Sequence, residues 1–119
     1  MPRADFRGAD LRRAELERAS APGADFSGAR LRGADLEKAD LSEALLVDAD
    51  LRDADLMEAS LAGARLTEAD LRGALLRRVG APGADFAEAR MRGVDLERAV
   101  LTGARLDGAD LSESDLDRL

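Results

Sequence analysis

The sequence predicts an all-β fold in which one chain winds as a quadrilateral, four-sided parallel β-helix of about six coils, each of 20 residues. Two observations carry this prediction. An apolar residue recurs every five positions along the whole chain, and several residue types recur only at multiples of 20. We call the apolar position the centre of each five-residue side, and we treat residues 1–119 as a single domain.

The five-residue period determines the local structure. Centres run from Phe6 to Leu116 without a polar member, and ten of the eleven glycines lie two residues after a centre. Five residues advance an α-helix by about 140° beyond a full turn, so the centres would form no stripe. A continuous strand needs alternation by two, which this spacing breaks in every repeat. A short strand followed by a turn fits, so the chain is predicted to coil as a solenoid.

The 20-residue period gives the number of sides. A coil of 15 residues would scatter the recurring residues over different walls, whereas a coil of 20 stacks each set as a column. Pro-Gly is a strong turn signal, because proline fixes the first corner position and glycine supplies positive φ at the second. The columns are Phe6, Phe26 and Phe86; Pro2, Pro22 and Pro82; and Arg12, Arg32, Arg52, Arg72 and Arg92.

Composition excludes several functions. The chain has no Cys and no His, so it forms no disulfide and no Ser–His nucleophile. No apolar run is long enough for a signal peptide or a membrane span. The net charge of −7 disfavours direct binding to nucleic acid or anionic lipid and suits a basic protein surface. We therefore expect a cytoplasmic protein without catalytic activity, cofactor or specific metal site.

The repeat unit resembles that of a known family. Ala34-Asp35-Leu36-Glu37-Lys38 and Ala54-Asp55-Leu56-Met57-Glu58 are similar to the Ala-Asp-Leu-x-x signature of pentapeptide repeat proteins, and the resemblance extends from about residue 4 to residue 118. It implies a right-handed quadrilateral β-helix. The position immediately before a centre is usually Asp or Asn in this family. It is apolar or small instead at four places in this chain: Leu45, Leu75, Gly80 and Val100.

Two surface columns are candidate functional sites. The acidic side carries carboxylates next to its centres, and the preceding side carries the arginine ladder. One interpretation is a solvated surface; the other is a ridge of carboxylates that faces a partner. The acidic side comprises Glu15, Asp35, Asp55, Asp95 and Asp115 before the centres and Glu17, Glu37 and Glu97 after them; the arginine ladder comprises Arg12, Arg32, Arg52, Arg72 and Arg92.

Three functions stay open at this stage. The first is a protein-interaction or scaffold module whose protein partner is unknown. The second is implied by the resemblance, because some pentapeptide repeat proteins imitate duplex DNA and bind DNA gyrase or another type II topoisomerase. A rod of about six coils at ~4.8 Å matches only about eight base pairs, so such mimicry would need a dimer. The third is a purely structural or engineered repeat array.

The ends of the solenoid predict self-association. Terminal coils expose an apolar cross-section and open backbone edges, which must be covered. Leu119 stands where Ala is usual and could cover the last coil. We expect a homodimer in which two chains stack end to end through the C-terminal coil, using Leu111, Leu116 and Leu119. The alternative is a segment of a longer array.

Overall fold

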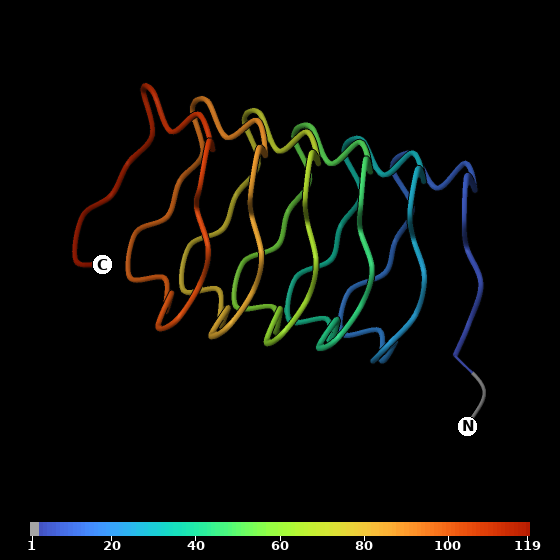
Figure 1. Cartoon of the computed structure of the whole chain (residues 1–119). Helices are drawn as coiled ribbons and strands as arrows, with labels where there is room; N and C mark the ends of the chain where they lie inside the picture. Colours follow the sequence, from blue (N-terminus) through green and yellow to red (C-terminus); the bar gives the residue numbers. More distant parts are fainter. Residues whose placement is uncertain (1–2) are drawn as a thin grey trace.

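The computed structural model describes residues 3–119, which wind as coils stacked along one axis. The molecule measures 35 × 24 × 23 Å, and its two ends lie at opposite ends of the long direction (Figure 1). The predicted turn at Pro2 lies outside the described residues. No helix that is long and apolar enough to cross a membrane occurs in residues 3–119.

The coils are joined by single-residue β-bridges. Each bridge is parallel and pairs residues 20 apart, from Asp5 with Asp25 to Asp95 with Asp115. Residues 3–119 contain no helix and no continuous strand, so the expectation of short strands was wrong in this detail. The physical reason is the side length, because each five-residue side spends two residues in its turn and interrupts the ladder there.

Every side repeats one backbone hydrogen-bond pattern. Asp35 donates its N–H to the Ala14 carbonyl of the previous coil at 2.9 Å. Leu36 and Lys38 donate theirs toward the next coil, to the carbonyls of Asp55 at 2.7 Å and Met57 at 2.9 Å. A fourth bond closes each turn. Because these bonds connect coils, the fold is held by contacts between residues about 20 apart in sequence.

The turn prediction is confirmed at the two Pro-Gly corners. Gly23 and Gly83 have φ of 72° and 68°. Lys38 and Glu58 occupy equivalent corners with φ of 60° and 59°, so this backbone tolerates L side chains at the same position. Left-handed backbone costs such residues roughly 1 kcal/mol, which the ladder bonds on either side offset.

The core consists of the centres and the alanines two residues before them. In the central coils these side chains are almost completely buried; Leu36, Leu56 and Leu76 are at most 1% exposed. The rings of Phe6 and Phe26 stack with centroids 4.9 Å apart, which confirms that they belong to one wall. Centres in the first and last coils are half-buried, and Leu116 is 44% exposed, because each lacks a neighbouring coil on one side.

Candidate functional site

One backbone contact explains the Asp before most centres. On the acidic side, Asp35 Oδ1 accepts the N–H of Glu37 at 3.1 Å, and Asp55 Oδ1 accepts the N–H of Met57 at 3.0 Å. Such a bond from a short side chain to the backbone two residues on stabilises a turn. One carboxylate oxygen therefore has a structural role, while Oδ2 is available for other contacts.

The structure brings part of the predicted acidic side together as two clusters. Asp35, Glu37 and Asp55 each offer an oxygen within 4.8 Å of the others. No ion pair within residues 3–119 involves any of these three residues. The second cluster has the same spacing and comprises Asp95, Glu97 and Asp115.

The two clusters are separated by one uncharged and one basic residue. Leu75 takes the Asp position and is 40% exposed. Arg77 follows it and contacts Asp95 at 2.9 Å and Glu97 at 3.6 Å, and the contact with Asp95 raises the pKa of the guanidinium. The second cluster is thus partly neutralised. By contrast, no basic side chain within residues 3–119 pairs with the cluster of Asp35, Glu37 and Asp55.

Glu15 and Glu17, which belong to neither cluster, complete the predicted acidic side. They make no ion pair in the part of the chain that the structure describes. Three close carboxylate oxygens are a ligand type that hard cations accept. The two clusters are therefore the places where a metal ion could bind. That the chain has no specific metal site and no catalytic activity stays a prediction.

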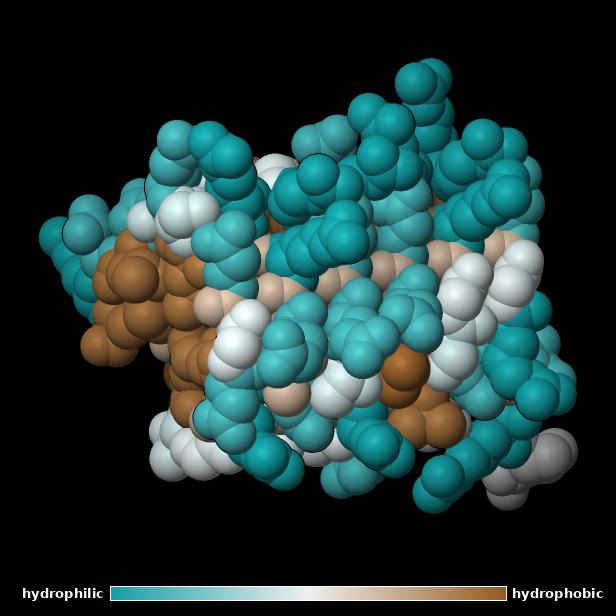
Figure 2. All heavy atoms as spheres, turned by 45° about the horizontal axis from the view of Figure 1, so that its top comes forward, coloured by the Kyte–Doolittle hydropathy of each residue, from teal (hydrophilic) through white to brown (hydrophobic). Residues whose placement is uncertain are grey.

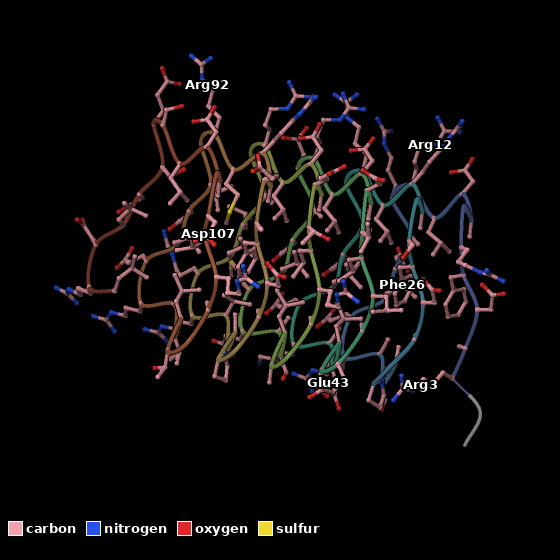
Figure 3. All side chains as sticks on the ribbon, viewed as in Figure 1. Arg3, Arg12, Phe26, Glu43, Arg92 and Asp107 are labelled. Carbon is pink, nitrogen blue, oxygen red and sulfur yellow. The ribbon has the colours of Figure 1, made fainter. Side chains whose placement is uncertain are left out.

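The arginine ladder is neutralised within its own side. Arg12, which is labelled in Figure 3, donates from Nε and Nη2 to Asp10 at 2.8 and 2.7 Å and so forms a forked ion pair. These contacts lower the pKa of Asp10 to about 2. Arg52 and Arg72 form the same fork with the Asp two residues earlier, Asp50 and Asp70.

Two members of the ladder find another partner because Arg, and not Asp, precedes them. Arg92 follows Arg90 and donates from Nε and Nη2 to Glu113 at 3.1 and 3.0 Å, 21 residues further on. Arg32 follows Arg30 and lies 3.8 Å from Asp53, again 21 residues on. Each ladder arginine therefore faces a carboxylate, so the ladder does not form a basic surface.

Sequence reasoning missed a third acidic feature, which we call the acidic corner: Asp48, Glu68 and Glu88. These residues lie at one turn of successive coils and line an open hollow of about 750 Å³ together with Asp50, Asp70 and Arg90. None of the three takes part in an ion pair among residues 3–119. Their 20-residue spacing was the available signal.

The predicted C-terminal contact residues remain accessible. Leu111 is half-buried, whereas Leu116 and Leu119 are 44% and 55% exposed. Leu119 lines a hollow of about 530 Å³ with Val100 and Leu101. It therefore leaves much of the last coil uncovered.

The stacked turns and inter-coil bridges define a β-helix built from five-residue repeats. Eight copies of the pentapeptide repeats match the sequence, over residues 3–37, 34–73 and 83–118. The chain belongs to the pentapeptide repeat family, as its Ala-Asp-Leu signature predicted.

Solved structures of the family resemble this chain. Rfr23 from the cyanobacterium Cyanothece 51142 is 33% identical with a TM-score of 0.72, and the match covers 82% of this chain and 64% of Rfr23. HetL from Nostoc sp. strain PCC 7120, a protein involved in heterocyst differentiation regulation, is 30% identical with a TM-score of 0.45, covering 96% and 62%. QnrB1, a plasmid-mediated fluoroquinolone resistance protein, is 23% identical with a TM-score of 0.42, covering 94% and 62%.

The chain thus spans less than two thirds of the length of these three proteins. No curated protein matches it. The likeness to Rfr23 supports the shared β-helix fold.

Proposed function

We propose that this chain is a non-catalytic interaction module whose acidic side binds a basic surface on a protein partner. The observation that carries the proposal is the cluster of Asp35, Glu37 and Asp55, whose carboxylates lie together without an ion pair among residues 3–119. The neighbouring arginine ladder, by contrast, is matched with carboxylates along its length. The two sides of one solenoid therefore differ in what they offer a partner.

The clustered carboxylates favour a cationic ligand for a physical reason. Two like charges about 4 Å apart repel by about 1 kcal/mol in a water-like dielectric, so a basic group that enters the cluster relieves this cost. The backbone bonds of Asp35 and Asp55 hold the side chains in place, which lowers the entropy lost on binding. Charge complementarity of this kind also accelerates association.

The proposal includes finer features of the fold and assembly. A right-handed, four-sided winding of about six coils would keep each charged column on one wall. An end-to-end homodimer through Leu111, Leu116 and Leu119 would extend the columns over two chains. The cytoplasmic location expected from the sequence remains a prediction.

Photo-crosslinking tests the proposal in cells that naturally express the chain. A photoreactive residue at Met57 samples the acidic side, and one at Thr102, exposed on the nearly uncharged side, is the control. We expect a partner to cross-link from position 57, with a yield that falls as salt is raised. The yield should be lost when Asp35→Asn, Glu37→Gln and Asp55→Asn are combined, because the negative charge is removed. The fold should persist, because the amide oxygens at positions 35 and 55 can still accept the turn bonds.

A matched triple variant, Asp10→Asn, Asp50→Asn and Asp70→Asn, removes the same number of charges from the arginine-ladder side and should leave cross-linking intact. Equal cross-linking from positions 57 and 102, or no effect of the acidic-side triple variant, would contradict the proposal. Absence of any partner at either position would favour the purely structural alternative.

DNA mimicry is the second candidate. The clustered carboxylates of the acidic side favour it. The longest dimension of 35 Å corresponds to only about ten base pairs at 3.4 Å, so mimicry would still need the proposed dimer. A DNA gyrase supercoiling assay, with and without a gyrase poison, tests this reading. Unchanged supercoiling and unchanged poisoning at micromolar protein would remove it and leave the first proposal untouched.

A further inference from the structure

The acidic side contains the same group of three carboxylates twice. The two copies are the first cluster, Asp35, Glu37 and Asp55, and the second cluster, Asp95, Glu97 and Asp115, which lies three coils further on. In both copies the first Asp accepts the backbone N–H two residues later, from Glu37 at 3.1 Å and from Glu97 at 3.0 Å. Because the backbone and the carboxylates are alike, a group held by one cluster indicates what the other can bind.

The second cluster holds a guanidinium in this structure. Arg77, from the coil before, places Nη2 2.9 Å from Asp95 Oδ2 and 3.6 Å from Glu97 Oε2. The hydrogen bond with Asp95 raises the pKa of Arg77, and the charges of Glu97 and Asp115 act in the same direction. One arginine therefore interacts with all three carboxylates. These contacts, and not only the acidity of the cluster, identify the chemical group that the arrangement accepts.

The first cluster lacks the corresponding arginine. Glu17 stands on the coil before it, in the place that Arg77 takes relative to the second cluster. Lys38, the basic residue next to Glu37, lies 3.9 Å from Glu58 instead. Within the described residues, this chain therefore supplies no guanidinium to the first cluster.

Apolar side chains border the first cluster on its other flank. Met57 follows Asp55 by two residues, and Leu75 pairs with Asp55 across a β-bridge and is 40% exposed. The methylene stem of an arginine packs on such surface while its head stays among polar groups. A calcium ion gains nothing from it and takes about six to eight oxygen ligands. Here Oδ1 of Asp35 and of Asp55 already accepts a backbone N–H.

Charge alone would not single out the first cluster. Hydrophilic side chains cover much of the face drawn in Figure 2, away from the hydrophobic patch at its left, so a cationic partner meets polar groups widely. A planar guanidinium can donate to two carboxylates at once, whereas the ammonium of lysine is a compact point charge. Paired carboxylates without an internal arginine therefore select arginine by geometry.

We propose that the first cluster binds the side chain of an arginine that a partner protein presents. The guanidinium contacts Asp35 and Glu37 as Arg77 contacts Asp95 and Glu97 in the second cluster, and the stem lies along the neighbouring apolar surface. The inference rests on the proposed function and names the side chain by which the partner is recognised.

NMR of the side-chain carboxyl groups tests the proposal with small probes. N-acetylarginine methylamide and N-acetyllysine methylamide carry the two cationic heads without other charges. We expect the arginine probe to shift the carboxyl signals of the first cluster in a saturable way at tens of millimolar, and at several-fold lower concentration than the lysine probe. The second cluster should respond less, because Arg77 already occupies it.

An exchange of residues between the two clusters sharpens the test. Glu17→Arg gives the first cluster the arginine of the second and should abolish its response to the arginine probe. Arg77→Glu makes the reverse change and should make the second cluster respond as the first does. Glu68→Arg is the matched control, since it makes the same charge change at an exposed turn outside both clusters, and it should leave the response intact. Circular dichroism checks that the variants fold.

Several results would overturn the inference. These are an equal response of the first cluster to the lysine probe, a response to calcium chloride but not to the arginine probe, an unchanged response in Glu17→Arg, and no response to the arginine probe at all.

Cross-linking from position 57 separates this inference from the proposed function. If the partner still cross-links to Glu17→Arg but not to the triple variant of the first cluster, the acidic side is the interface and the arginine inference fails. If the triple variant still cross-links, the proposed function fails, even where the small probe binds. Loss in Glu17→Arg with retention in Glu68→Arg supports both.

Discussion

The acidic side and the arginine-ladder side share one backbone and differ in a single side-chain choice. On both, an Asp before the centre accepts the N–H two residues later, as Asp55 does from Met57 and Asp70 does from Arg72. When the later residue is Arg, its guanidinium also takes the second oxygen and neutralises it. When it is Glu37 or Met57, no ion pair within residues 3–119 occupies the second oxygen of Asp35 or Asp55, whereas Asp95, which precedes Glu97, is bound by Arg77 of the previous coil. Whether the second carboxylate oxygen is free therefore depends on residues that do not belong to the core and do not determine the fold.

The largest expected effect is on stability, from substitutions that test whether the core residues of the two sides contribute equally to the free energy of unfolding. Leu51 lies under Arg52, and Leu56 lies under Met57; both are 0% exposed. Leu51→Ala and Leu56→Ala should each lower the free energy of unfolding by about 2–5 kcal/mol, because each leaves a cavity in a closed core. Urea denaturation measures both. A clear difference between the two losses of unfolding free energy would mean that the ion pairs on the surface affect the stability of the core beneath them.

The next effect concerns the turn bond that both sides share. Asp55→Ala removes the acceptor for the Met57 N–H and should cost about 1 kcal/mol of unfolding free energy. Asp55→Asn keeps an acceptor oxygen at the same position and should retain most of the stability. Thermal unfolding of the two variants separates the turn bond from the charge. Equal losses would show that the carboxylate charge itself stabilises the turn.

Charge substitutions should move the two sides in opposite directions. Arg72→Gln breaks an ion pair at 2.6 Å and should lower the unfolding free energy by at most about 1 kcal/mol, because Arg72 is 45% exposed. Glu37→Gln removes a repulsion and should raise it by about 0.5 kcal/mol or less. Both changes should shrink in 1 M salt. Destabilisation by Glu37→Gln would contradict the view that this cluster is unneutralised.

The smallest effect is local and is measured by NMR titration of carboxyl groups. The fork with Arg12 lowers the pKa of Asp10 to about 2, and Arg12→Gln should return that pKa toward its ordinary value of 3.8. Because the folded-state pKa is depressed, the pairing stabilises the fold above pH 4 and loses its contribution as pH falls from about 4 to 2. Arg13→Gln is the control and should leave the pKa of Asp10 low.

Much of the molecule followed from the sequence. The column of Phe6 and Phe26, the buried centres and the positive φ at Gly23 were all predictable, because each depends only on periodicity and on residue type. The arginine column was predicted too, but its neutralisation was not recognised. Asp10 and Arg12 lie two apart, so that pairing was readable locally; the contacts of Arg92 with Glu113 and of Arg77 with Asp95 cross between coils.

The sequence by itself determined which residues are interior, since a strict repeat of apolar residues leaves a coiled chain one way to bury them. Only the tertiary structure decided which charges remain unpaired, because that depends on side chains from adjacent coils meeting at hydrogen-bond distance. It likewise decided the direction of the hydrogen bonds between coils. Every five-residue side donates two N–H groups to the next coil and one to the previous coil, and this direction is a property of the stacked backbone and not of any single repeat.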